Sequence, residues 1–196
     1  LHGIMVGSWV PHIPLAKERL DVGPGVFGLA LLAIAAGAVT AMPLTGAMIN
    51  RYGSSRVSLV TGALFCLAFA GPVTAPTLVP FAIMGYLLGA LIGSMDVAMN
   101  AHGIAVEKAL KRPIMSMLHG GFSVGGMVGA FAGAWAMKHM GEFTHIALAG
   151  GACLVLLFIS VQFLLPRSID KGLSDTHFGW PTKATIGLGL LCFLAL

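Results

Sequence analysis

The feature that most constrains this chain is a series of apolar runs, each long enough to cross a lipid bilayer as a single helix. A helix needs about 20 predominantly apolar residues to span the hydrocarbon core. Five runs reach that length, at 26–49, 57–75, 78–106, 113–137 and 144–165. Shorter apolar segments flank them at 1–15 and 184–196. We therefore expect an all-α membrane protein, in which 1–15 is the outgoing end of a first helix.

The composition argues against a soluble enzyme domain. Apolar residues make up 57% of the 196 residues, whereas Asp, Glu, Lys and Arg together make up 9%, against about 25% in soluble domains. So few charges cannot cover a water-exposed surface, so the lipid bilayer is an expected partner. The net charge of +4 is not gathered into a basic patch with interleaved aromatic residues, and nucleic acid is not expected. No spacing typical of metal ligands joins the histidines and cysteines.

The domain organisation follows from the order of the runs. Both ends of the sequence lie inside apolar segments, so we expect a piece of a longer protein. Residues 1–165 would form a six-helix half with a truncated first helix, 166–183 a polar cytoplasmic linker, and 184–196 the start of a seventh helix. The missing C-terminal half would then be a partner of this one.

The basic residues predict how the helices are oriented. The gaps after the second, fourth and sixth expected helices hold eight Lys and Arg residues, and the other gaps hold three. Cytoplasmic loops carry the excess of Lys and Arg. We therefore expect a multi-pass protein whose N-terminus is cytoplasmic, in a bacterial inner membrane.

The gap at 46–56, GAMINRYGSSR, resembles the signature loop of the major facilitator superfamily, G-x-x-x-D-[RK]-x-G-[RK]-[RK]. The match covers Gly46, Arg51 and Gly53. Asn50 replaces the usual Asp, and two serines replace the usual basic pair, with Arg56 one step later. The resemblance implies a helical bundle of two six-helix halves with the substrate between them, and a loop that latches the halves together. An ordinary positively charged cytoplasmic loop is the alternative.

A second resemblance lies in the fourth expected helix, at 85–100, where glycines at every fourth position precede an acid and an amide. The pattern is similar to that of the fucose permease-like sugar transporters. The segment 7–14, GSWVPHIP, is similar to the end of the first helix in the same branch, which implies that Trp9 and His12 contribute to a sugar-binding cavity. For Trp9, a position in the aromatic belt at the membrane interface is the alternative.

Asp96 is the acid of this pattern, and it lies well inside an expected helix. Its distance from the helix end places it about 15 Å deep, near the midplane, at 1.5 Å per residue. An intramembrane carboxylate is costly unless it is protonated, paired or wet. Asp96 and Asn100 share a helix face with three glycines, Gly85, Gly89 and Gly93, so we expect both to face the bundle. Because a buried carboxylate is costly, we also expect Asp96 to bind a proton. The alternative is a structural carboxyl group bonded to Asn100 or to a neighbouring backbone.

The fifth expected helix carries a similar stripe of small residues, which predicts close helix packing. Its members are Gly121, Gly125, Gly129 and Gly133. His119 lies beside this stripe at a depth similar to that of Asn100, so both are candidates to bind substrate. A structural histidine is the alternative.

Together these features predict a secondary transporter that moves a small polar solute, such as a sugar, by alternating access. We expect no cofactor, with a proton gradient as the energy source. Two alternatives remain open at this point: an exporter of lipophilic compounds with the same fold, and a membrane sensor that does not transport. Ligand binding without flux would identify the sensor.

Overall fold

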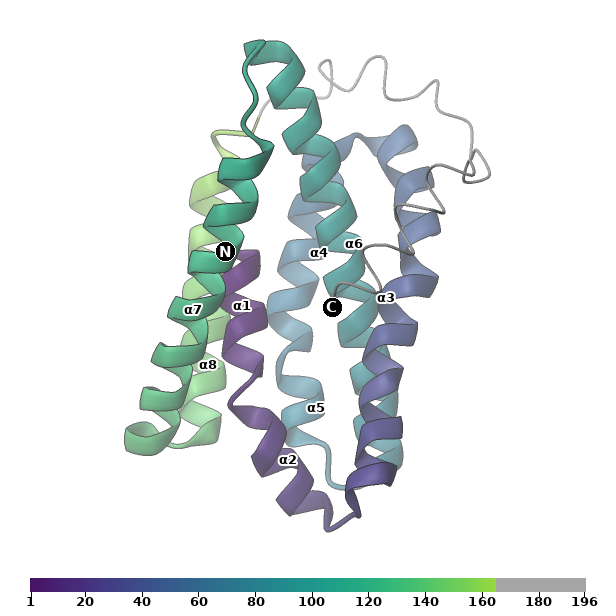
Figure 1. Cartoon of the computed structure of the whole chain (residues 1–196), viewed down its shortest axis with the longest axis vertical. Coiled ribbons are helices and arrows are strands. Elements are labelled where there is room, and N and C mark those ends of the chain that lie inside the picture. The colour runs from purple at the N-terminus through teal and green to yellow at the C-terminus, as the bar shows by residue number, and fades with distance from the viewer. Residues whose placement is uncertain (165–196) are drawn as a thin grey trace.

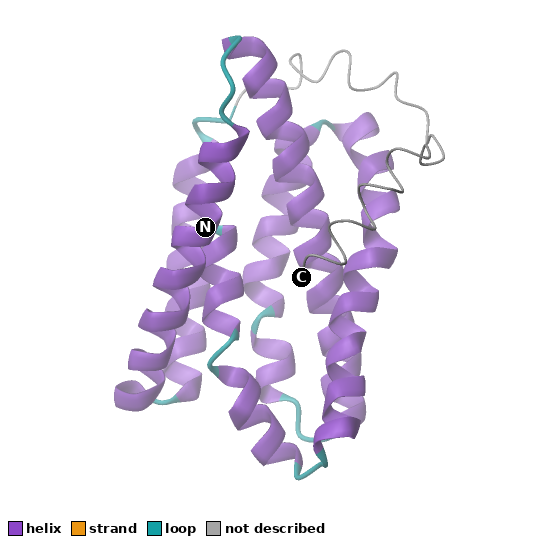
Figure 2. Cartoon of the chain, in the orientation of Figure 1, coloured by secondary structure: helices purple, strands orange, loops and turns teal. Residues whose placement is uncertain are grey.

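Residues 1–164 are the part of the chain that the computed structural model describes, and they form eight helices and no strand (Figures 1 and 2). The helices are α1 His2–Trp9, α2 His12–Leu20, α3 Pro24–Tyr52, α4 Ser54–Ala68, α5 Ala70–Thr74, α6 Leu78–Leu110, α7 Met115–Met140 and α8 Glu142–Val161. The expected linker at 166–183 and the expected helix at 184–196 lie outside the described residues.

Four segments are long and apolar enough to cross a membrane, which agrees with an all-α membrane fold. They are Pro24–Tyr52, Ser54–Thr74, Leu78–Leu110 and Glu142–Val161. Helix α7 has 26 residues but is not among the four, because its many glycines lower its mean hydropathy.

The first expected helix is divided in two, which the apolar pattern alone did not predict. Helix α1 ends at Trp9, and the Val10 amide bonds the Gly7 carbonyl three residues back at 3.1 Å. Pro11 follows and has no N–H to continue the ladder, so the chain restarts as α2. The second part also runs to Leu20, five residues beyond the apolar segment.

Helices α3 and α6 lie in backbone contact along the glycine stripe of α6. A Cβ atom at Gly89 would overlap the Ile34 carbonyl group, and one at Gly93 would lie 2.8 Å from the Ala38 backbone. Gly37 on α3 makes a matching close approach to α6. Small residues permit such contacts in a membrane, where van der Waals packing replaces the hydrophobic effect between helices.

Helices α1 and α7 form a second close pair, side by side in Figure 1. A Cβ atom at Gly3 would overlap the Phe122 carbonyl oxygen, and one at Gly129 would overlap that of Ile4. Along the same stripe, Gly125 lies against Ile4 and Gly133 against His145. Gly121 differs from these residues, because a Cβ atom there would meet nothing within 4 Å.

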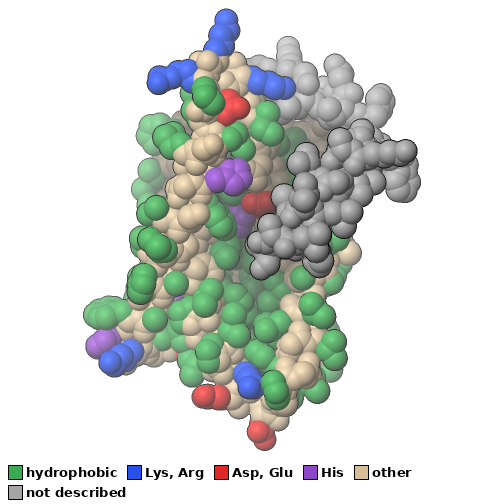
Figure 3. All heavy atoms as spheres, viewed as in Figure 1, with side chains coloured by type: hydrophobic (Ala, Val, Ile, Leu, Met, Phe, Trp, Pro, Cys, Tyr) green, Lys and Arg blue, Asp and Glu red, His purple; other side chains and the backbone are tan. Residues whose placement is uncertain are grey.

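The outer surface suits contact with lipid. Large apolar side chains such as Leu29, Val39 and Phe131 are exposed. In Figure 3, Lys and Arg side chains lie at the two ends of the visible face, with apolar side chains between them. We call the end with Arg51, Arg56, Lys108, Lys111 and Arg112 the basic end, and the end with Lys17, Arg19 and Glu142 the opposite end.

The contact between α3 and α6 predicts an asymmetric response to adding one methyl group. Gly89→Ala should lower the free energy of unfolding by about 1–3 kcal/mol, because the backbone of α3 must move away. Gly28→Ala, also in a helix but with open space around it, should be neutral or stabilise by about 0.5–1 kcal/mol. Thermal unfolding of both variants of the whole protein in detergent checks this. Equal melting temperatures would show that α3 and α6 do not touch at Gly89.

Candidate functional site

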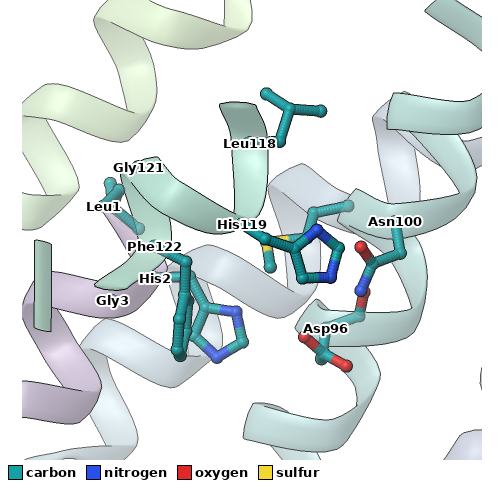
Figure 4. A pocket seen from close by; sticks show the side chains of 10 residues that line it. Leu1, His2, Gly3, Asp96, Asn100, Leu118, His119, Gly121 and Phe122 are labelled. Carbon is teal, nitrogen blue, oxygen red and sulfur yellow. The ribbon is translucent and has the colours of Figure 1, made fainter. Parts of the chain in front are cut away.

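A cavity of about 430 Å³ opens between α1, α6 and α7 (Figure 4). Its lining residues are Leu1, His2, Gly3, Asp96, Met99, Asn100, Leu118, His119, Gly121 and Phe122. Three residues that the sequence singled out on two different helices, Asp96, Asn100 and His119, therefore share one space. Gly121 also lines this cavity and leaves room for it, rather than packing against a helix.

Asp96 and Asn100 reach the cavity from successive turns of α6. Asn100 Nδ2 donates a hydrogen bond to the Asp96 backbone carbonyl at 3.0 Å. The amide is thus tied to the backbone of Asp96, whereas the sequence suggested a bond with its carboxyl group. Asp96 is half-buried, and its carboxyl group stays available to the cavity.

His119 reaches the cavity from α7. Its Nδ1 atom lies 3.0 Å from the Met115 carbonyl oxygen, one turn earlier on the same helix. Because a carbonyl oxygen only accepts, Nδ1 must carry the hydrogen. In the neutral ring, Nε2 then carries the lone pair, so His119 presents an acceptor at its other edge.

His2 is a cavity residue that sequence reasoning missed. Its side chain is buried, and neither ring nitrogen has a hydrogen-bond partner. The ring makes edge-to-face contacts with Phe65 at 5.6 Å and Phe122 at 5.4 Å between centroids. Its position inside an apolar run is the signal that could have identified it, because intramembrane histidines are rare and mark functional sites.

Trp9 and His12 lie outside this cavity. Trp9 is buried in the core, where its ring packs near Phe69 and Phe81, so it occupies neither the cavity nor the lipid interface. His12 is fully buried and stacks on His145 with 5.1 Å between ring centroids.

A buried polar network accounts for His12. Its Nδ1 atom lies 3.2 Å from Glu142 Oε1, and its Nε2 atom lies 2.9 Å from His145 Nδ1. An ionised carboxylate only accepts, so His12 donates to Glu142 and accepts from His145. Both nitrogens of His12 are thus occupied.

Within residues 1–164, no three His, Cys, Asp or Glu side chains are arranged to hold a metal ion.

Arg19 completes the network at the opposite end of the bundle. Its guanidinium group lies 3.2 Å from Glu142 Oε2 and donates to the Pro72 carbonyl at 3.3 Å. The network therefore joins α2, the short helix α5 and the start of α8. It fixes α2, the second part of the first expected helix, to the rest of the bundle.

The glycine of the signature loop has a clear structural reason. Gly53 alone separates α3 from α4, with φ 89° and ψ 152°, a conformation that is essentially restricted to glycine.

The other residues of the signature loop lie near this turn. Gly46 has open space around it, and Asn50 and Arg56 are exposed at the basic end. The Arg51 guanidinium group lies over the Tyr52 ring at 5.3 Å. Behind the turn, the Ser54 hydroxyl group is 2.8 Å from His102 Nδ1, which ties the loop to α6.

Comparisons with known proteins agree with this architecture. A family model described as Major Facilitator Superfamily matches residues 1–195. The chain is 36% identical over 196 residues to an MFS-type transporter of Yersinia pestis, covering 98% of this chain and 50% of that protein. It is 37% identical over 133 residues to a transporter of Sinorhizobium fredii, covering 68% of this chain and 35% of that protein.

A third relative is the membrane protein MosC of Rhizobium meliloti, which is 30% identical over 177 residues. That match covers 90% of this chain and 42% of the relative. The chain therefore spans half or less of the length of these relatives. No solved structure is significantly similar to it.

The buried network predicts that two histidines respond very differently to truncation. His12→Ala leaves the buried His145 Nδ1 atom without its partner and removes one of the two partners of the half-buried Glu142 carboxylate, which should lower the free energy of unfolding by about 1–3 kcal/mol. His139→Ala removes an exposed side chain that bonds only its own helix, so the change should stay within about 0.5 kcal/mol. Denaturation of the two variants in detergent compares them. A loss for His139→Ala as large as for His12→Ala would contradict the network.

Proposed function

The chain belongs to the Major Facilitator Superfamily, and from this premise we propose that it forms the N-terminal half of a secondary transporter for a small polar solute. Two relatives carry the word transporter in their names, and the chain spans about half of the first. In transporters of this architecture the substrate binds near the midplane between two halves, which rock around it to expose it alternately to each side. A C-terminal half that we expect to complete the site would face the cavity.

The observation that carries the proposal is the convergence of Asp96, Asn100 and His119 on one cavity at mid-depth. Polar side chains are costly within a membrane and mark substrate or ion pathways there. The cavity has room for a solute of modest size, and a sugar is the first candidate because of the resemblance to the fucose permease-like branch.

We further propose that transport is coupled to protons through Asp96. When the halves close around the solute and water leaves, an unpaired carboxylate would be strongly disfavoured. A bound proton removes that charge, so solute and proton would cross together. This mechanism needs no cofactor beyond the proton gradient.

The arrangement of charges supports a location in a bacterial inner membrane with the basic end in the cytoplasm. Five Lys and Arg residues lie at the basic end of the described residues, and three lie at the opposite end. The relatives named above are bacterial. In this orientation the first helix runs outward, and the N-terminus of the whole protein would lie in the cytoplasm.

An exporter of lipophilic compounds is the second candidate, because four large apolar side chains also line the cavity: Leu1, Met99, Leu118 and Phe122. A thermal-shift screen of the whole protein against hexoses, pentoses, amino acids and lipophilic compounds separates the two. A ligand at about 100 times its Kd stabilises the folded state by about 2.7 kcal/mol. Shifts with hexoses or pentoses support the proposal, shifts with lipophilic compounds alone support the exporter, and binding without flux would indicate a sensor.

Replacing Asp96 tests the coupling directly. Asp96→Asn keeps the shape of the side chain but cannot exchange a proton, so it should abolish accumulation driven by a pH gradient and spare exchange of bound solute. Uptake of the labelled solute by proteoliposomes, with and without the gradient, measures both activities. Asp21→Asn makes the same change at an exposed acid and should behave like the unmodified protein. Undiminished gradient-driven uptake by Asp96→Asn would exclude the coupling role.

A further inference from the structure

We infer that the cavity selects solutes that donate hydrogen bonds and carry no negative charge, which favours polyhydroxy compounds and primary amines over carboxylates and phosphates. The inference deepens the proposed function, since it assumes that this cavity is the place where the solute binds. It rests on which polar atoms of the cavity remain free after the bonds within the protein are counted.

The first free atom is Nε2 of His119. The bond between Nδ1 and the Met115 carbonyl oxygen fixes which nitrogen carries the hydrogen, because a carbonyl oxygen can only accept. The neutral ring therefore has a lone pair at Nε2 and no second N–H. A solute that meets this edge must provide a donor.

The second free atom is Oδ1 of Asn100. Its Nδ2 atom faces the Asp96 backbone carbonyl, which can only accept, so the orientation of the amide is fixed. The carbonyl oxygen of the side chain is left as an acceptor. In Figure 4 the His119 ring and the Asn100 amide lie next to each other, although they come from different helices.

Among residues 1–164, Asp96 adds the only carboxyl group that lines this cavity, and no Lys or Arg residue in that range lines it. In the described part of the chain, the titratable side chains that face it are His2 from α1, Asp96 from α6 and His119 from α7. With the two imidazole rings neutral, the cavity carries either a negative charge or none, depending on whether Asp96 holds a proton. On this side of the site, an anionic solute would meet acceptors and like charge, and the described residues offer no fixed positive charge to offset them.

Donors within the cavity are few by comparison. Asn100 has one further N–H, and Asp96 has one O–H only when it holds a proton. A neutral His2 has one N–H on a ring whose nitrogens are buried beside Phe65 and Phe122. Hydroxyl groups can satisfy such a site because each one donates as well as accepts, and ammonium groups only donate. A carboxylate only accepts, so it would leave the free acceptors of His119 and Asn100 without partners.

Cysteine reactivity tests this preference without knowledge of the natural solute. Gly121→Cys places a thiol in the cavity, where a Cβ atom has open space. Gly120→Cys is the matched control, because it has equally open space on the same helix and does not line the cavity. Both variants are made in the whole protein with its other cysteines replaced, and are studied in detergent.

Three thiosulfonate reagents are compared. The aminoethyl reagent is cationic and has N–H donors, and the trimethylammonioethyl reagent is cationic but has none. The sulfonatoethyl reagent is anionic. Rates are divided by those with 2-mercaptoethanol, a small uncharged thiol, to remove intrinsic differences in reactivity. At Gly121→Cys we expect the aminoethyl reagent to exceed the sulfonatoethyl reagent by about tenfold or more, since a charged cleft concentrates ions of opposite sign. It should also exceed the trimethylammonioethyl reagent. In an Asp96→Asn background the preference over the anion should fall.

Several results would overturn the inference. One is a faster reaction of the anionic than of the aminoethyl reagent at Gly121→Cys, and another is the same ratio of these two rates at Gly120→Cys. Equal normalised rates for the two cationic reagents at Gly121→Cys would also contradict it, as would a thiol at Gly121→Cys that no reagent reaches. None of these measurements depends on transport. Loss of the proposed function would instead appear as an absence of flux with the reagent preferences intact.

Discussion

Close approach between helix backbones is the constraint on which the rest of this structure depends. In a bilayer the lipid chains are as apolar as the side chains, so helices gain little by burying apolar surface against one another. They associate where glycine lets them pack closely, as α3 does on Gly89 and α1 does on Gly129. The stripe on α7 continues one turn further to Gly121, where no neighbour fills the space. The stripe that holds the bundle together thus also provides the wall of the cavity.

The polar side chains divide into groups that the protein satisfies and groups that it leaves free. His12 and His145 are bonded within the network at the opposite end, and His102 is bonded near the signature loop. In the cavity, His2 has no partner and His119 uses one nitrogen for its own helix. Unpaired polar groups inside a membrane are costly, so they persist where a ligand, proton or water can use them. That contrast, more than the size of the cavity, is the reason why we propose it as the functional region.

The sequence predicted what depends on local pattern, and it missed what depends on distant contacts. Helical period and run length located the long helices, and placed Asp96, Asn100 and His119 on faces that meet. The pairing of His12 with His145 joins residues 133 positions apart, and no spacing rule reveals it. One histidine in an apolar run, such as His2, gives no periodic signal, and its rarity within such a run is the only local sign of it. Trp9 was expected at a cavity or an interface, but it packs in the core near Phe69 and Phe81, which are at least 60 positions away in the sequence.

Two single-glycine turns show how the two three-helix units of this bundle correspond to each other. Gly53 joins α3 to α4 and Gly141 joins α7 to α8, both with φ near 90°, at opposite ends of the bundle. Three-helix units of inverted orientation are nested within each half of such transporters. The main contacts follow this symmetry, because α3 packs on α6 as α7 packs on α1. A two-fold axis relates the two three-helix units, and side chains near that axis lie close to their counterparts in the other unit. The first helix of one unit is α1 and that of the other is α6, so His2 on α1 and Asp96 on α6 can reach the same cavity.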